Sequence, residues 1–571
     1  MKLLISDYIG SLKERRELDA ILPDLLSELG FHVFSRPGIG TAQRGVDVAA
    51  VGKDARGNEK VYLFCVKPGD LTRQEWDGNP QKMRPSLNEI LDDYIPNRIP
   101  AAYRKLGVVI VLCLGGNVHE NVRSQVSTFT KRHSKGRISF EEWNGDKLAE
   151  LLLAGVLREK VLPKPLQSHF QKAVAMVDQP DVSYEHFAHL VHDLRNEVKT
   201  DKDRVRVARQ IYICLWVLFV WARDIDNLDA PYRASELALL NVWYLLKPFL
   251  GKRTSNARAV MLVLQHLVQL HLAIGTLFLD TKIIPHVVQQ NALSIAVGSI
   301  ESVDVNLKMF EVMGRLALNG HWLLWAARLT DTEPDEAAMN ILRGRVKAGM
   351  QLLHHNPALF LPLMDEQAIE VTLFLTLAAY IGNADNDIRV WLNEMVKRWR
   401  VAVNGHGRYP CVFREYRDLV DHPRSRSDEY RKEATTGSIL LPLVAAWLAA
   451  LGDREAMAML VEMKSAVLAH CTLQLWLPEA ASEDHIYLND AIHGVALTDL
   501  PVTEDGQDLL KVVHDACDKS DGFVKLTAVQ YGQLPLLLTA CRHYRLPVPP
   551  QYWIALLFQP SAAAGAATDV G

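Results

Sequence analysis

The chain has 571 residues, of which 49% are hydrophobic and 23% charged, and its formal net charge is -4. This length predicts two or more domains, and this balance excludes disordered and collagen-like proteins. A charge so close to zero also excludes a chain that attracts nucleic acid through its overall charge alone. The seven cysteines are scattered without a CxxC pair, which argues against a disulfide framework and against a cysteine zinc site.

The composition changes character near residues 162–165. Upstream, helical stretches alternate with short β-branched runs, and downstream, long helical periodicities follow one another with almost no strand signal. Residues 1–165 carry 25 Lys and Arg against 21 Asp and Glu, whereas the remainder carries 38 against 46. We therefore expect a multidomain protein, with an α/β domain over residues 1–165, an all-helical region over 166–560 and a disordered tail over 561–571.

The N-terminal region begins with an amphipathic helix, because leucines recur at helical spacing and a glycine follows at the C-cap position. Short apolar runs then predict three strands, the first two separated by a glycine-rich loop. The expected elements are the helix 14–29 and the strands 31–34, 45–51 and 60–67.

Two charged residues mark this predicted sheet. Asp47 stands inside the otherwise apolar second run, and Lys67 ends the third. An aspartate and a lysine at the ends of adjacent strands are costly in a core unless they have partners or a metal. Taken singly, Lys67 also fits an exposed strand terminus, and Asp47 a turn cap after Gly45.

The order of helix, strand, GVDV, hairpin and apolar strand ending in lysine resembles the PD-(D/E)xK, or restriction-endonuclease-like, nuclease fold, closest to its Mrr-like branch. The resemblance continues through a core strand at 106–114, a closing strand at 138–143 and a helix at 144–152. It implies a metal-dependent endonuclease that acts on DNA with Mg²⁺ or Mn²⁺.

Mapped onto this sequence, the resemblance makes Asp47 the metal-binding aspartate and Lys67 the catalytic lysine. Asp19 matches the acidic residue of the first helix, with Glu17 as the nearby alternative metal ligand. In such sites carboxylates hold the cations that activate water, and a lysine stabilises the developing negative charge.

One position departs from the family pattern. The residue two before the lysine should be Glu, Asp or Gln, and here it is Cys65. Hard cations prefer oxygen to sulfur. Either another oxygen replaces it, from Glu59, Asp70 or a backbone carbonyl, or the site has lost strong metal binding.

Dispersed basic residues of the N-terminal region are candidates for phosphate contacts. We name Arg36, Arg73 and Arg84 as nucleic-acid-binding candidates, with ordinary solvated charges as the alternative. Trp76 either stacks on a base or packs in the core. Further along, residues 398–432 interleave basic and aromatic side chains, which indicates either an anion-binding surface or a salt-bridged connection.

Helical segments between 182 and 557 predict a solenoid of helical repeats or an irregular bundle that binds a protein partner or trigger. A nuclease-like head on a helical body resembles effectors of prokaryotic antiviral defence. The alternative is an inactive nuclease fold that serves as a nucleic-acid-binding or protein-interaction scaffold. We expect a cytoplasmic protein without a membrane span, because apolar runs such as 211–222 stay below the roughly 20 residues a bilayer requires. The sequence is compatible with a homo-oligomer.

Overall fold

The computed structural model describes residues 19–35, 44–54, 56–79, 82–155, 164–330, 335–382, 384–405, 407–422 and 427–558. Two compact units make up the chain. The first comprises residues 1–238 and 248–267, and the second residues 239–247 and 268–571.

A mixed five-stranded sheet forms the N-terminal part of the first unit. Its strands follow the order β1-β2-β3-β4-β5, antiparallel from β1 to β3 and parallel from β3 to β5. The strands are β1 (His32–Ser35), β2 (Val48–Lys53), β3 (Glu59–Lys67), β4 (Gly107–Leu114) and β5 (Ile138–Trp143). The predicted coarse layout, an N-terminal α/β domain followed by a large helical region, is thus confirmed.

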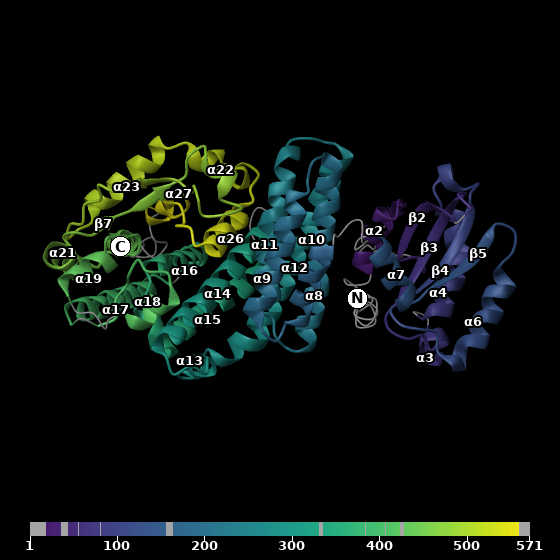
Figure 1. The fold of residues 1–571 in the computed structure, drawn as a ribbon, viewed down its shortest axis with the longest axis horizontal. Coiled ribbons are helices and arrows are strands. Elements are labelled where there is room, and N and C mark those ends of the chain that lie inside the picture. Colours follow the sequence, from purple (N-terminus) through teal and green to yellow (C-terminus); the bar gives the residue numbers. More distant parts are fainter. Residues whose placement is uncertain are drawn as a thin grey trace, which may run out of the picture. The chain divides into compact units, whose positions relative to one another are not determined.

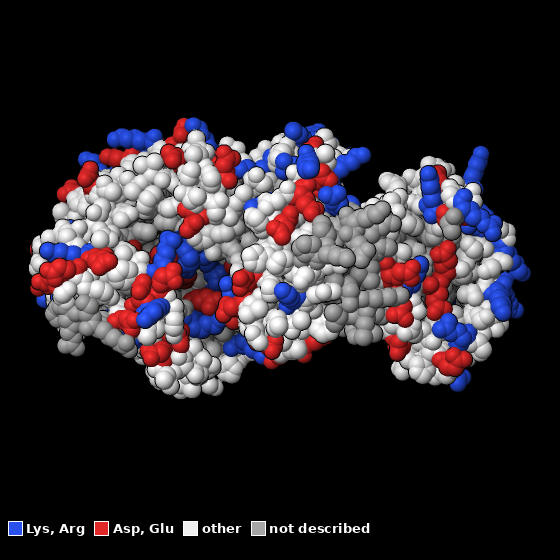
Figure 2. Space-filling model, viewed as in Figure 1, with Lys and Arg blue, Asp and Glu red and all other residues white. Residues whose placement is uncertain are grey.

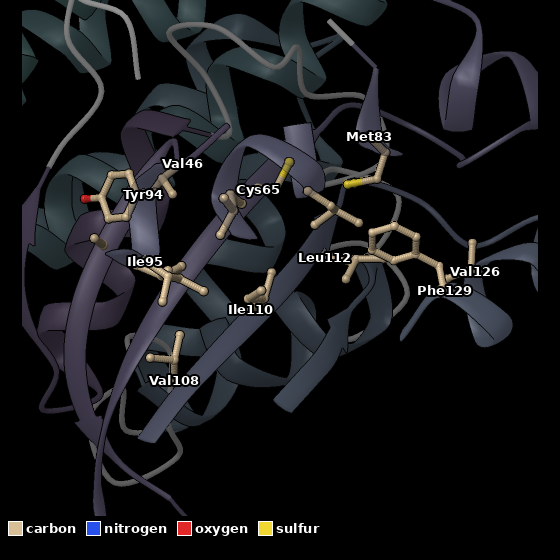
Figure 3. Packing of buried hydrophobic residues seen from close by; sticks show 14 of the residues in the cluster. Val46, Cys65, Met83, Tyr94, Ile95, Val108, Ile110, Leu112, Val126 and Phe129 are labelled. Carbon is tan, nitrogen blue, oxygen red and sulfur yellow. The ribbon is translucent and has the colours of Figure 1, made fainter. Parts of the chain in front are cut away.

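Helices cover both faces of this sheet (Figure 1). They are α2 (Asp19–Glu28), α3 (Arg73–Asp77), α4 (Met83–Glu89), the π-helix η2 (Ile90–Tyr94), α5 (Ile95–Asn97), the 3₁₀ turn η3 (Ala101–Tyr103), α6 (Glu120–His133) and α7 (Gly145–Gly155). One face of β3 packs against α3 to α6, because Val61, Leu63 and Cys65 alternate into the same apolar cluster as buried side chains of those helices. Figure 3 shows Cys65 within this cluster together with Val46 and Leu112.

The opposite face of β3 is aromatic. Tyr62 meets Phe31 edge-on at 5.0 Å between ring centroids, and Phe64 meets Trp143 at 5.1 Å. The two faces of β3 are therefore both buried, which explains why its sequence reads as one continuous apolar run.

Long helices make up the rest of the first unit, and two of them extend into the second. These are α8 (Lys164–Ala175), α9 (Pro180–Asn196), α10 (Asp201–Asp224), α11 (Asp229–Leu246) and α12 (Ser255–Phe278). The start of α10 is set by a capping box, in which Thr200 and Asp203 each bind the other's backbone N–H.

The second unit is mainly helical and is organised around α14 (Ser302–Thr330). Its other helices are α13 (Ala292–Ala296), α15 (Glu336–His355), α16 (Ala368–Ile381), α17 (Asp385–Asn404), α18 (Tyr416–Asp421), α19 (Asp428–Ala434), α20 (Leu440–Ala450), α21 (Arg454–Ala466), α22 (Ser482–His485), α23 (Gln507–Lys519), α24 (Gly522–Lys525), α25 (Thr527–Gln530), α26 (Leu534–Tyr544) and α27 (Pro550–Trp553). Its short strands are β6 (Gly437–Ser438), β7 (Thr472–Leu473), β8 (Leu475–Leu477) and β9 (Val495–Leu497).

Helix α14 packs against α15 and α16, which are close in the chain, and also against the distant α26. The buried Trp322 of α14 donates from its indole N–H to Thr539 of α26 at 3.1 Å. In a solenoid each repeat contacts only its neighbours. This long-range packing therefore favours the irregular bundle over the repeat array.

Two helical stretches are longer than the apolar runs of the sequence indicated. By length and composition, residues 201–224 and 255–286 are long and apolar enough to cross a membrane. In the most apolar 18-residue window of residues 201–224, 83% is buried inside the protein. In the corresponding window of residues 255–286, 56% is buried. The first is therefore accounted for as a core helix, and the expected cytoplasmic location stays a prediction.

Candidate active site at one end of the N-terminal sheet

The structure places Asp47 directly before β2 rather than inside a strand. Its backbone N–H donates to the Phe64 carbonyl at 2.9 Å, and its carboxylate Oδ2 accepts from the Val66 N–H at 2.7 Å. The carboxylate thus accepts a β3 backbone hydrogen bond that a backbone carbonyl would accept in a continued β2–β3 ladder. The proposed turn cap after Gly45 is not what this oxygen does, because its partner lies on the neighbouring strand.

Lys67, the last residue of β3, is buried, with a relative exposure of 7%. An exposed strand terminus is therefore the wrong interpretation of this lysine. Because residues two apart on a strand share a face, Lys67 leaves β3 on the same side as Cys65, toward α3 to α6.

The register brings the three motif positions together. Val48 pairs with Phe64 in the antiparallel β2–β3 ladder, so one further step sets Asp47 opposite Cys65. Directly opposite residues in such a ladder have Cα atoms about 5 Å apart. Asp47, Cys65 and Lys67 therefore start from neighbouring backbone positions at one end of the sheet, as the resemblance required.

Cys65 brings sulfur to the position where the family pattern has an oxygen ligand. The side chain is fully buried in the apolar cluster between the sheet and α3 to α6 (Figure 3). On the next strand, burial raises the pKa of the Cys113 thiol, and the Asp47 carboxylate raises it further. That neighbouring thiol therefore stays protonated and adds no negative charge to the site.

Of the two side chains considered as replacements for Cys65, Glu59 lies too far away, and one oxygen of Asp70 is already engaged. Glu59 begins β3 and Lys67 ends it, so the two are about 26 Å apart along the strand. Asp70 lies closer, but its Oδ1 accepts from the Asn117 backbone N–H at 2.7 Å and fastens the loops that follow β3 and β4.

Within the described residues, no group of three or more His, Cys, Asp and Glu side chains is arranged to hold a metal ion. Of the acidic residues in the family pattern, Asp47 is the one that the described residues place at the end of β2 and β3. Glu17 lies outside the described residues, and Asp19 is described only as the first residue of α2. The described part of the site therefore does not by itself make a Mg²⁺ site, since that ion prefers several oxygen ligands.

The predicted nucleic-acid contacts stay predictions, and the three arginines lie in different settings. Arg84 pairs with Asp77 at 2.6 Å, Arg73 is exposed at the start of α3, and Arg36 lies outside the described residues. Trp76 is 1% exposed and meets Phe129 edge-on at 5.6 Å between ring centroids, so it packs in the core.

In the basic and aromatic stretch at 398–432, the described arginines form salt bridges, whereas residues 406 and 423–426 lie outside the described residues. Arg398 pairs with Glu394 at 2.9 Å and Arg400 with Glu462 at 2.7 Å. The buried Trp399 shows that aromatic side chains of this stretch also serve the core. The described residues of this stretch therefore favour the salt-bridged connection over an anion-binding surface.

Sequence reasoning overlooked a more compact basic group in the N-terminal domain. Residues 131–137 read KRHSKGR and span the end of α6 and the turn before β5. The sequence shows four cations within seven residues. It does not show that this basic group lies beside the loop before β4.

No family model, curated protein or solved structure matches this chain. Its function is therefore inferred from the geometry at the ends of β2 and β3.

Proposed function

We propose that the N-terminal domain is a PD-(D/E)xK-like phosphodiesterase that cuts DNA. The observation that carries this proposal is that Asp47, directly before β2, lies beside the end of β3, where the buried Lys67 is 7% exposed. A sheet terminus without a function has no need of a buried ammonium group, because burying a charge is costly.

The roles follow from the chemistry of the two groups. Hydrolysis adds a water oxygen to phosphorus and breaks the bond to one ester oxygen, which leaves as an alcohol after gaining a proton. The Lys67 ammonium group would stabilise the negative charge that builds up at the phosphate. Asp47, whose Oδ2 is held by the Val66 N–H, would present its remaining lone pairs toward the reacting water or a cation.

Dependence on Mg²⁺ or Mn²⁺ belongs to this proposal through the family resemblance. The described residues alone do not complete the ligand set, so no step is assigned to a metal ion here. Adding each cation, or EDTA, to a plasmid-nicking assay tests the dependence directly.

Two nearly isosteric substitutions test the site. Asp47→Asn keeps an acceptor for the Val66 N–H, and Lys67→Met keeps the apolar stem, so both remove mainly charge. We expect each to lower the nicking rate at least 100-fold. Matched changes at exposed positions, Asp92→Asn and Lys172→Met, should leave the rate within about twofold of wild type. Equal rates for the site variants and these controls would overturn the proposal.

Cys65 favours a second candidate function, that of an inactive nuclease fold used as a scaffold for nucleic acid or protein. Its buried thiol stands where the family pattern has an oxygen ligand. Cys65→Gln and Cys65→Glu restore that oxygen. If the wild-type site is weakened only by the thiol, either variant should raise the nicking rate about tenfold or more. If neither the wild type nor these variants cut DNA, the result supports the scaffold function.

The helical region would then bind the trigger or protein partner that controls cutting, as in an effector of prokaryotic antiviral defence. The test is a plaque assay in bacteria that express the wild type or the Lys67→Met variant. Protection that is lost with Lys67→Met supports this role, whereas equal plaque numbers in both strains contradict it.

A further inference from the structure

The N-terminal sheet has a second polar end, opposite the candidate active site. The β2–β3 turn, the start of β4 and the start of β5 all lie at this edge, because Lys60 pairs with Gly107 and Val108 pairs with Ile138. Lys67 lies at the other edge, about 26 Å away along β3.

Exposed cations collect at this second edge, which we call the basic end. Figure 2 shows Lys and Arg side chains gathered along the side of the domain that α6 and β5 form. The basic end consists of Lys53 and Arg56 at the β2–β3 turn, Arg104 and Lys105 before β4, and Lys131, Arg132 and Lys135 between α6 and β5. Within the part of the chain that the structure describes, none of these seven side chains forms an ion pair.

Two acidic residues lie in the β2–β3 hairpin beside this group. Glu59 stands opposite Lys53 in the ladder, whereas Asp54 is already neutralised. Asp54 pairs with Lys60 at 3.0 Å, and the hydrogen bonds from Lys60 and from the Asn58 backbone hold the pKa of Asp54 at about 2. Its charge is therefore matched by a lysine that we do not count in the basic end.

An arginine holds the two main loops of the basic end together. The Arg137 guanidinium donates to the backbone carbonyls of Arg104 and Leu106, at 3.4 Å for the latter. The Val108 N–H donates to the Arg137 carbonyl at 2.7 Å. The cations before β4 and those before β5 are thus fixed beside each other by backbone contacts, so their charges act on one surface.

The character of the surface indicates what binds it. Protein interfaces have a core of apolar and aromatic side chains, whereas nucleic-acid interfaces are polar and strongly positive. Among the described residues of 19–155, no large hydrophobic side chain is exposed. A polyphosphate backbone therefore fits the basic end better than a protein does.

We propose that the basic end binds the phosphate backbone of DNA at a site separate from the candidate active site. This inference deepens the proposed function, since it assigns the holding of DNA and the cutting of DNA to opposite edges of one sheet. A separation of about 26 Å corresponds to about eight base pairs of duplex. A duplex that lies along the domain can therefore reach both edges.

Binding of a fluorescein-labelled 20-base-pair duplex to the full chain, measured by anisotropy in EDTA, tests the site without any cutting. The test variant carries Lys131→Glu, Arg132→Glu and Lys135→Glu. We expect its Kd at low salt to rise at least tenfold, and the slope of log Kd against log salt concentration to fall by about two to three. A second variant with glutamine at these positions should weaken binding in the same direction, and it excludes an effect of glutamate on the end of α6.

The matched control carries Lys252→Glu, Arg253→Glu and Arg258→Glu, exposed cations before and at the start of α12 that change the net charge equally. Its Kd should stay within about threefold of wild type. An equal loss in the control, or unchanged binding in both test variants, would overturn the proposal. Tighter binding of polyglutamate than of DNA would overturn the choice of ligand. Because binding is measured in EDTA without any cutting, the nicking rates of the Asp47→Asn and Lys67→Met variants do not decide this inference.

Discussion

The carboxylate of Asp47 accepts a hydrogen bond of 2.7 Å from the backbone N–H of Val66, one residue before Lys67. The same contact therefore stabilises the end of the β2–β3 ladder and sets the carboxylate beside the lysine strand. Because Asp47 has this double role, the effects of its charge and of its hydrogen bond have to be measured with separate substitutions.

The two roles of Asp47 predict different effects on stability. Asp47→Ala leaves the Val66 N–H without its acceptor and should cost about 1–2 kcal/mol in free energy of unfolding. Asp47→Asn retains an oxygen acceptor and should cost clearly less, although it removes the charge. Urea unfolding of both variants measures the difference, and equal destabilisation would show that the hydrogen bond is not what Asp47 contributes to the fold.

Gly45 fixes the approach of the chain to Asp47. Its φ of +78° lies in the left-handed region, and a Cβ there would come within 2.1 Å of the Ser86 carbonyl oxygen. Gly45→Ala should therefore cost about 3 kcal/mol or more and reduce DNA cutting as well. Gly57 is a matched control, because its φ is +83° with no atom near its Cβ position. Gly57→Ala should cost only about 1 kcal/mol, and similar losses in both would contradict the steric argument.

His321 predicts an acid-sensitive second unit. Its Nε2 lies 2.9 Å from the Leu373 carbonyl, and its Nδ1 lies 3.1 Å from the Tyr552 hydroxyl, so the neutral ring donates to the former and accepts from the latter. Burial lowers the pKa of His321 to about 4. Below pH 6.5 the unfolded chain binds a proton that the folded one does not, so this stability is full above pH 6.5 and is lost as the pH falls toward 4.

The loss at His321 should amount to about 2 kcal/mol between pH 7.5 and pH 5. His321→Gln keeps a donor and an acceptor but does not titrate. Urea unfolding at both pH values should therefore show a pH dependence that is smaller by this amount in the variant. The same pH dependence in both proteins would show that His321 is not its source.

Asp365 caps the start of α20 from a buried position. Its carboxylate accepts from the Ser438 hydroxyl at 2.5 Å and from the backbone N–H groups of Ile439 and Leu440 at 2.6 and 3.2 Å. Burial nevertheless raises the pKa of Asp365 to about 6. Asp365→Asn points an amide N–H₂ at one of these donors and should cost about 1–3 kcal/mol. The exposed Asp387→Asn should change the free energy of unfolding by less than about 0.5 kcal/mol, and a similar value for Asp365→Asn would refute the cap.

The local sequence was sufficient to predict the strands themselves. The runs 60–67, 106–114 and 138–143 appear as β3, β4 and β5 within a residue at each end, because both faces of a central strand are buried and the apolar run shows its length.

Tertiary structure decided which side chains meet. The sequence set Asp47 inside a strand and left Lys67 open between a core and a surface position, whereas pairing with β3 sets Asp47 in the bend before β2 and buries Lys67. It also brought the cations before β4 beside those before β5, although about 30 residues separate them. Hydrophobic periodicity reports only on neighbours along the chain, while strand order and register determine which chain ends share an edge of the sheet.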